Sequence, residues 1–279
     1  MPKDQKINKN VAFDFENNIF RKHITQDKFE SELEMSLLAN TIGSTSNLFN
    51  TPSVSGIDRE KCLLEFELIQ EAITVRKYFV DLAKWGASPE KLAVLEKTFF
   101  KLGQSIYLIH STELGSIDIA IKEFPNGFLK VRTPQDKVLI HGDFTLSNIL
   151  ISPKTKRINI IDWSTSPIYE FSANVGPRYW DLSFFISSLY YFSYSTFLSI
   201  QVRISLVKAF LSGYLQDTDI VSTEFLKDLS DFLKSYNYYE LYYSNGLVKT
   251  NSSNRFLIAR SRKKLNQLIT KLPSLITES

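Results

Sequence analysis

Three side chains that carry oxygen ligands lie close together within residues 138–163. Asp143 follows a short apolar run, Asn148 comes five residues later, and Asp162 ends a third apolar run. The second and third runs flank turn-forming residues at 152–155, so they are predicted to form a hairpin that brings Asp162 back beside the other two. One carboxylate that orients a hydroxyl group, with two oxygen ligands for magnesium, meets the needs of phosphoryl transfer.

The spacing of these residues matches a known catalytic motif. The chain reads His-Gly-Asp at 141–143, has Asn148 at the required distance, and reads Ile-Asp at 161–162. This pattern resembles the aminoglycoside phosphotransferase and choline kinase family, whose loop H-G-D-x-x-x-x-N is followed by an I-D motif. The resemblance implies that Asp143 accepts the hydroxyl proton and that Asn148 and Asp162 bind magnesium. A plain turn that caps loop backbone groups is the simpler structural alternative.

The N-terminal part of the chain has the pattern of a small β-rich lobe. Alternating apolar residues predict a hairpin over residues 11–24, and apolar residues at helical spacing predict a helix over 27–42. Residues 43–60 are rich in Gly, Ser, Thr and Asn and are predicted to be loop. Residues 61–69 predict a strand that runs into a connector. In the resembled family such a lobe covers the nucleotide.

The resemblance also implies a lysine–glutamate pair in this lobe. A strand lysine of the family contacts the α and β phosphates, and Lys22 lies on the second predicted strand. A helix glutamate holds that lysine, and Glu34 fits this role. Glu30 and Glu32 compete for it, because helix register cannot be read from the sequence. A solvated strand lysine is the alternative interpretation of Lys22.

Two further nucleotide-binding features of kinase-like lobes, the adenine-binding connector and the phosphate-covering loop, are less clear in this sequence. The family's connector binds the adenine edge through its backbone, which would fall to Glu67 and Ile69, although an ordinary strand end fits these two equally well. Kinase-like lobes also carry a Gly-containing loop over the phosphates. No such loop precedes Val11, and residues 15–19 contain no glycine. Either residues 16–18 perform a shortened version of that task or the lobe has lost a strand.

The remainder of the chain is predicted to be mainly helical around the catalytic hairpin. Ser88-Pro89 marks a helix start, and His110 near the end of that helix is expected to be a packed structural residue. By the resemblance, Asp181 opens a later helix and braces the catalytic loop through backbone hydrogen bonds. The C-terminal helices are predicted over residues 184–197, 202–215, 223–245 and 254–272.

Aromatic residues gather in this C-terminal part. Tyr239 and Tyr243 would share neighbouring helix faces with Glu240, which could present rings and a carboxylate to a cationic or sugar-like acceptor. Packing of these rings in the core is the simpler interpretation.

Composition limits the classes of function. The 33 basic and 30 acidic residues leave a net charge of only +3, which gives no support to nucleic-acid binding. Cys62 is the one cysteine and the three histidines are scattered, so neither a disulfide nor a Cys-based zinc cluster is expected. The sequence shows neither a secretory signal nor an apolar run long enough to span a membrane, so we expect a cytoplasmic protein with no membrane partner.

These observations predict an α+β, two-lobed, protein-kinase-like fold. Residues 1–69 would form the reduced N-terminal lobe that covers the nucleotide, and residues 70–279 the helical C-terminal lobe with the catalytic loop. The implied function is ATP-dependent phosphorylation of a hydroxyl group on a small molecule, with ATP and Mg²⁺ as cofactors. A ligand-binding pseudoenzyme of the same fold is the alternative, and a protein kinase is disfavoured because H-G-D replaces H-R-D.

Overall fold

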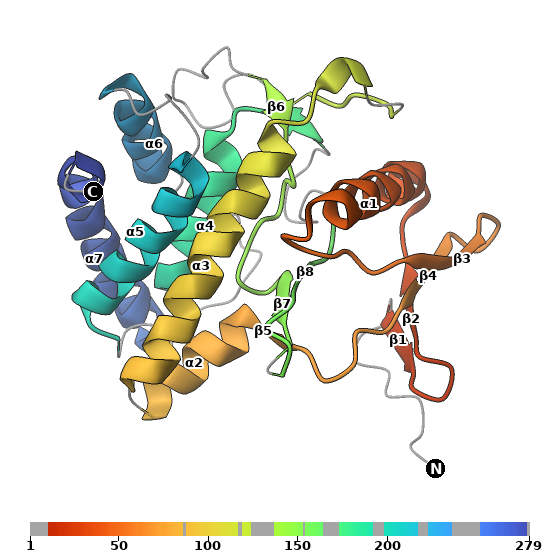
Figure 1. Ribbon diagram of the computed structural model, residues 1–279, viewed down its shortest axis with the longest axis horizontal. Coiled ribbons are helices and arrows are strands. Elements are labelled where there is room, and N and C mark those ends of the chain that lie inside the picture. The colour runs from red at the N-terminus through yellow and green to blue at the C-terminus, as the bar shows by residue number, and fades with distance from the viewer. Residues whose placement is uncertain are drawn as a thin grey trace.

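A computed structural model describes residues 11–85, 88–116, 119–123, 137–152, 154–163, 173–191, 198–216, 223–235 and 252–277. A four-stranded sheet with one long helix lies at one end of the molecule, a group of helices lies at the other, and a small hairpin lies between them (Figure 1). The tyrosine-rich segment with Tyr239, Glu240 and Tyr243 falls outside the described residues.

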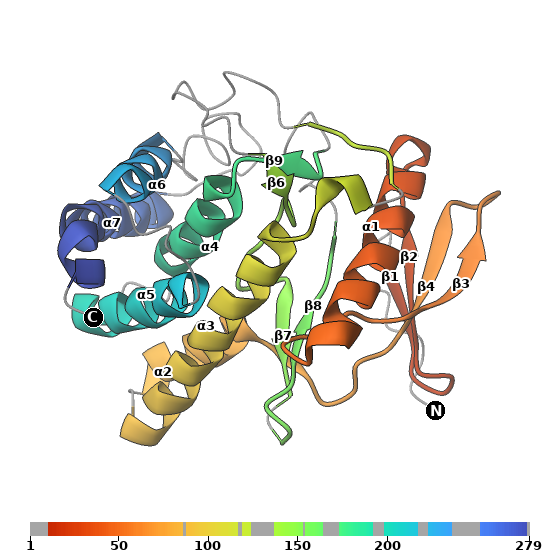
Figure 2. The same ribbon diagram turned by 45° about the horizontal axis from the view of Figure 1, so that its top comes forward.

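The N-terminal sheet is antiparallel, with the order β1-β2-β4-β3. Its strands are β1 (Val11–Asp14), β2 (Ile19–His23), β3 (Val54–Asp58) and β4 (Leu63–Glu67). Helix α1 (Gln26–Ser46) lies against it and shares a small apolar core made of Phe29, Leu33, Leu64 and Phe66 (Figure 2). The predicted hairpin, helix and strand of this part are therefore confirmed.

The prediction of loop throughout residues 43–60 is wrong. β3 forms at the edge of the sheet, and its register against β4 shifts between Val54 and Gly56. Interspersed serine and glycine lower the strand propensity of this segment, so its strand character comes from pairing with β4. Pairing across a fold is the kind of contact that local sequence patterns do not record.

The predicted catalytic hairpin is present. β7 (Ile149–Ile151) and β8 (Ile158–Ile160) pair antiparallel, and β5 (Ile73–Thr74) extends the sheet beyond β7. A separate pair, β6 (Val138–Leu139) with β9 (Val175–Gly176), holds the chain that enters the catalytic loop. The isoleucines at 149, 151, 158 and 160 are all buried, which explains why two such short strands keep one register.

The other regular elements of the described chain are helices. They are α2 (Val75–Trp85), α3 (Pro89–His110), the 3₁₀ turn η1 (Leu114–Ser116), α4 (Tyr179–Tyr191), α5 (Ile200–Leu215), α6 (Thr223–Ser235) and α7 (Ser252–Thr277). The predicted start of α3 is confirmed, because the Ser88 side chain accepts a hydrogen bond from the Lys91 N–H at 3.3 Å. None of the helices in the described ranges is long and apolar enough to cross a membrane.

Helices α3 and α5 approach each other at glycines. A Cβ atom added at Gly103 would lie 2.0 Å from the carbonyl oxygen of Phe210, and one added at Gly213 would lie 2.0 Å from that of Phe100. These contacts are with backbone atoms, so no side chain can move to relieve them.

We therefore expect Gly103→Ala to reduce the free energy of unfolding by about 3 kcal/mol, because the two helices must separate. Gly115→Ala is the matched control, since a Cβ there meets nothing within 4 Å, and it should change stability by less than about 0.5 kcal/mol. Urea unfolding of both variants measures the difference. Equal stability of the two variants would contradict the close helix contact.

Candidate active site

The catalytic loop joins Asp143 to Asn148 directly. The side-chain amide of Asn148 donates to the carbonyl oxygen and to the Oδ2 atom of Asp143, both at 3.0 Å. These two bonds leave the amide oxygen of Asn148 available for another ligand. The Oδ1 atom of Asp143 is buried and has no hydrogen-bond partner. Asp143 thus presents one unused acceptor.

Lys22 reaches across from the N-terminal sheet to this loop. Its ammonium group forms ion pairs with Glu32 on α1 and with Asp162, which follows β8. Burial alone lowers the pKa of Lys22, but the carboxylates of Asp162 and Glu32 raise it overall, so the side chain stays charged. Segments 140 residues apart in the sequence therefore meet at one cation.

The structure corrects the expected partner of Lys22 from Glu34 to Glu32. Glu32 is 4% exposed and lies on the same face of α1 as Phe29 and Leu33, which pack against the sheet. Glu34 is two residues further along the helix, so it points elsewhere, and its carboxylate accepts a hydrogen bond from the Ala120 N–H at 3.2 Å. Glu30, the other competitor, pairs with Arg59 at the surface.

The environment of Asp143 opposes its negative charge. Burial raises the pKa of Asp143 well above its usual value, and the nearby Asp162 carboxylate raises it further, while the hydrogen bond from Asn148 lowers it. Asp162, in contrast, is 44% exposed and lies beside Lys22. Two neighbouring carboxylates in different surroundings are suited to two different roles.

Asp181 holds the backbone of the catalytic loop. Its carboxylate accepts hydrogen bonds from the His141 N–H at 2.7 Å and the Gly142 N–H at 3.0 Å. The same carboxylate lies 3.2 Å from His110 Nε2, and His110 Nδ1 lies 2.9 Å from the Tyr214 hydroxyl. The expected brace is therefore present, and His110, 5% exposed, is the packed structural residue that was predicted.

His141 fixes the position of Asp143 rather than facing the cleft. Its Nε2 atom lies 3.0 Å from the Ile161 carbonyl oxygen, and its Nδ1 atom accepts the Asp143 N–H at 3.2 Å. Burial lowers the pKa of His141, which favours the neutral ring that these two bonds require. His141 thereby ties Asp143 to the segment that precedes Asp162.

Asp181→Asn should destabilise the protein by about 2–4 kcal/mol, because an amide nitrogen would face backbone N–H donors in a fully buried site. kcat should also fall more than KM rises, since the loop would lose its fixed position. Asp231→Asn is the control, because Asp231 pairs with Lys234 at the surface and should change stability by less than about 1 kcal/mol. A thermal melt and steady-state rates of both variants test this; an unaltered melting temperature for Asp181→Asn would refute the brace.

The turn between β1 and β2 lies at the end of these strands away from Lys22, which bears on whether residues 16–18 act as a shortened phosphate-covering loop. Lys22 pairs with Val11 at one end of the strands, whereas residues 15–18 lie at the other end, where Asn18 contacts Gln70. Residues 16–18 therefore cannot cover Lys22 as a shortened loop would.

Residues 116–223 match the model of the phosphotransferase enzyme family APH. This segment is therefore similar to members of that phosphotransferase family. It contains Asp143, Asn148, Asp162 and Asp181, so the resemblance inferred from the motif is confirmed, and so is the class of enzyme. No curated protein matches the sequence significantly.

Solved structures of several kinases share the fold of this chain. A glucosamine kinase in complex with glucosamine, ADP and inorganic phosphate has a TM-score of 0.63 and 12% identity, covering 99% of this chain and 81% of that one. An amicoumacin kinase in complex with AMP-PNP and Ca²⁺ has a TM-score of 0.56 and 12% identity, covering 93% and 86%. A choline/ethanolamine kinase family protein from Mesorhizobium loti has a TM-score of 0.52 and 12% identity, covering 96% and 89%. The predicted two-lobed, kinase-like α+β fold is confirmed.

The carboxylates of this site suit a cation that is held partly by a nucleotide. Within the described ranges, no group of three His, Cys, Asp or Glu side chains could hold a metal ion by itself. Mg²⁺ commonly binds one or two carboxylates together with substrate phosphates. The amide oxygen of Asn148, which takes no part in its two bonds to Asp143, and the partly exposed carboxylate of Asp162 can supply such protein ligands. The residues present therefore fit a nucleotide-associated magnesium ion.

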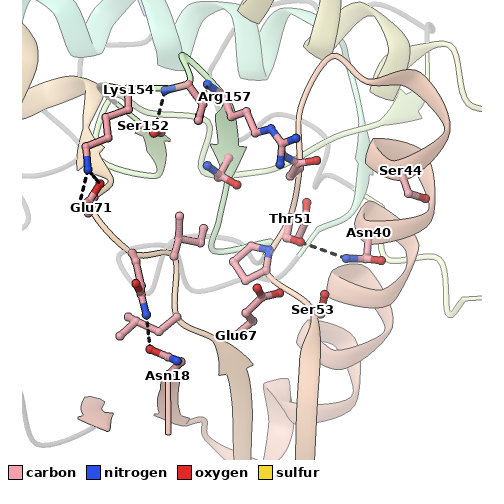
Figure 3. A pocket seen from close by; sticks show the side chains of 17 residues that line it. Asn18, Asn40, Ser44, Thr51, Ser53, Glu67, Glu71, Ser152, Lys154 and Arg157 are labelled. Carbon is pink, nitrogen blue, oxygen red and sulfur yellow. Dashed lines mark hydrogen bonds and ion pairs between the residues drawn. The ribbon is translucent and has the colours of Figure 1, made fainter. Parts of the chain in front are cut away.

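Residues 67–71, at the end of β4 and in the connector that follows it, line the pocket drawn in Figure 3. Glu67 and Ile69, the residues expected at the adenine edge, both line it. The Glu67 N–H donates to the Ser53 carbonyl oxygen at 2.9 Å, and the Leu68 N–H donates to that of Asn18 at 2.8 Å. Both N–H groups already donate hydrogen bonds within the protein. An adenine contact here remains a prediction, in which the Glu67 carbonyl oxygen and the Ile69 peptide group would meet the base.

Proposed function

We propose that this phosphotransferase transfers the γ-phosphoryl group of ATP to a hydroxyl group of a small molecule. The observation that carries the proposal is the convergence of Lys22, Asp143, Asn148 and Asp162 at one point between the sheet and the helices. In this proposal residues 1–69 and 70–279 act as the two lobes on either side of the nucleotide.

Each residue of this cluster has a role that its surroundings support. The unused Oδ1 atom of Asp143 accepts the hydroxyl proton and orients the attacking oxygen. Asn148 and Asp162 hold Mg²⁺, which when bound supplies charge neutralisation for the phosphates. Lys22, held by Glu32, contacts the α and β phosphates, and the connector at Glu67 and Ile69 meets the adenine edge. Most of the rate acceleration then comes from positioning and charge stabilisation.

We propose that the acceptor is a hydroxylated amine or an amino sugar, and that the protein acts in the cytoplasm. Support comes from the structural relatives, which include a glucosamine kinase and a choline/ethanolamine kinase family protein. The nucleotide and a divalent cation are supported by the amicoumacin kinase complex with AMP-PNP and Ca²⁺.

The first experiment separates binding from turnover. The melting temperature is measured with ATP, with Mg²⁺, and with both; we expect the largest rise with both together, because the cation and the phosphates complete one site. Glucosamine, choline and ethanolamine are then tested as acceptors by following ADP release. No thermal shift with MgATP would refute the nucleotide site.

Lys22→Ala should raise the KM for ATP and lower kcat together, each by about tenfold, because the ammonium group both binds and orients the phosphates. Lys61→Ala is the control, since Lys61 pairs with Asp58 at the surface. Steady-state kinetics with varied ATP measures both constants. If the two variants behave alike, Lys22 takes no part in binding the phosphates and serves only to join Glu32 to Asp162.

A second candidate is a nucleotide-binding protein of the same fold without turnover. It is favoured by the β1–β2 turn, which lies at the connector end of the strands and away from Lys22. This candidate predicts a thermal shift with MgATP and no phosphorylated acceptor. The acceptor test therefore distinguishes the two functions.

A further inference from the structure

The polar pocket at the connector has a volume of 680 Å³. We call it the connector pocket. It is bordered by the second half of α1, by residues 50–53 that lead into β3, by residues 67–71, and by the turn of the β7–β8 hairpin (Figure 3). This volume falls within the range of small-molecule sites in proteins.

The connector pocket is separate from the catalytic cluster. Of the described residues that line it, none is Lys22, Asp143, Asn148 or Asp162. β4 lies between β2, which carries Lys22, and β3, whose entry segment forms the pocket wall. Asn40 follows Glu32 by eight residues, which is about 12 Å along the helix.

One buried polar group in the connector pocket lacks a partner. The Thr51 hydroxyl group is buried and has no hydrogen-bond partner, and Thr51 is 7% exposed. Native proteins rarely leave such a group unsatisfied, because it costs about 1–3 kcal/mol. A ligand with hydroxyl groups could supply the missing partner. Asn159, which also lines the pocket and is 7% exposed, offers such a ligand an amide group.

The surrounding contacts hold Thr51 in place. The Asn40 amide donates to the Thr51 carbonyl oxygen at 3.0 Å, which joins α1 to the segment before β3. The Asn50 N–H donates to the Ile158 carbonyl oxygen at 2.9 Å, which joins the same segment to the hairpin. The pocket wall is therefore pre-formed, which reduces the ordering cost of binding.

The charges around the connector pocket balance. Lys154 forms an ion pair with Glu71 at 2.7 Å. Figure 3 shows Arg157 in the upper part of the view and Glu67 in the lower part, so one positive and one negative side chain remain at opposite rims. With two lysine or arginine and two glutamate residues, the lining has no net charge. The pocket has no electrostatic preference for a charged ligand over a neutral one.

We propose that the connector pocket binds a small, neutral, polyhydroxylated molecule, such as a monosaccharide or a polyol. Amide and hydroxyl groups of the wall exchange hydrogen bonds with its hydroxyl groups, and Thr51 and Asn159 are the contacts that fix it. The pocket shares Glu67 and Ile69 with the proposed adenine contact. Its ligand is detected without any nucleotide present, so either proposal can fail without the other.

Saturation-transfer NMR with D-glucose as the probe tests this inference. We expect saturable binding with a Kd on the order of 1–10 mM, measured up to about 50 mM glucose. Thr51→Val removes only the hydroxyl group and should raise the Kd about fivefold, and Asn159→Leu should raise it about tenfold. Melting temperature is not the readout, because sugars raise it for most proteins by exclusion from their surface.

Three further variants make the test specific. Thr41→Val, the same change on an exposed part of α1 outside the pocket, should leave the Kd unaltered, and so should Asp143→Asn. Ser44→Phe, at the exposed rim, should block the pocket without disturbing the buried groups. The proposal is overturned if glucose shows no saturable binding, or if the Thr51, Asn159 and Ser44 variants bind it as tightly as the parent protein does. Loss of binding in Asp143→Asn alone would also overturn it.

Discussion

Asp143→Asn is expected to lower kcat by about 10²–10⁴-fold while the affinity for MgATP stays within a few-fold of the parent. The substitution removes the acceptor for the hydroxyl proton but keeps the shape of the side chain and its place in the loop. Asn148 and Asp162 are untouched, so the proposed metal ligands remain. The measurement is single-turnover transfer to the acceptor, with MgATP binding followed by calorimetry.

The pKa of Asp143 supplies an independent check of its role. Because burial raises that pKa above the unfolded value, the ionised carboxylate opposes folding at neutral pH. The stability associated with this group is fully present below the unfolded pKa and is lost as the pH rises through the folded pKa. Asp143→Asn should therefore melt at the same or a higher temperature than the parent at pH 7.

The same shift should appear in the kinetics. A base must be ionised to act, so the acidic limb of kcat/KM should lie above the usual range of an aspartate. Turnover within about tenfold of the parent, or an acidic limb near pH 4, would contradict the assignment of Asp143 as the base.

Asp162→Asn is expected to weaken MgATP binding by about 30-fold, equivalent to ~2 kcal/mol, because a charged metal ligand becomes neutral. Binding of ATP without Mg²⁺ should change much less, because no metal ligand is lost in that case. The variant also frees Lys22 from one of its two carboxylates, which leaves the lysine able to bind the phosphates. Asn is the suitable replacement, since Asp162 has a φ of 64° and Asn tolerates this left-handed region.

The control for this variant is Asp58→Asn, which alters a surface ion pair with Lys61. Titration calorimetry with and without Mg²⁺ gives the four affinities required. Equal losses with and without the metal would mean that Asp162 acts only through Lys22 and holds no metal ion.

The catalytic hairpin could be predicted because its evidence is local. Runs of isoleucine on each side of a turn dictate two buried strands, and the positions of Asp143, Asn148 and Asp162 follow from that geometry. The bracing role of Asp181 was also accessible, through the family resemblance. The same local evidence explains why the start of α3 was found.

Other features depend on contacts between distant segments. Glu32, rather than Glu34, meets Lys22 because the rotation of α1 is set by Phe29 and Leu33 packing on the sheet. The apolar spacing of Phe29 and Leu33 could have favoured Glu32, which lies on the same helix face. The links from Asp181 to His110 and from His110 to Tyr214 span 71 and 104 residues, and no local pattern indicates them.

The central claim is transfer of a phosphoryl group from ATP to a small hydroxylated acceptor at Asp143. The most direct measurement is phosphorus NMR of the protein with MgATP and each of glucosamine, choline and ethanolamine, run in parallel with Asp143→Asn. The account predicts that one acceptor yields ADP and a phosphate monoester in equal amounts with the parent protein, and that the variant forms neither. Binding of MgATP without a phosphorylated acceptor in any mixture, or equal product from the variant, would contradict it.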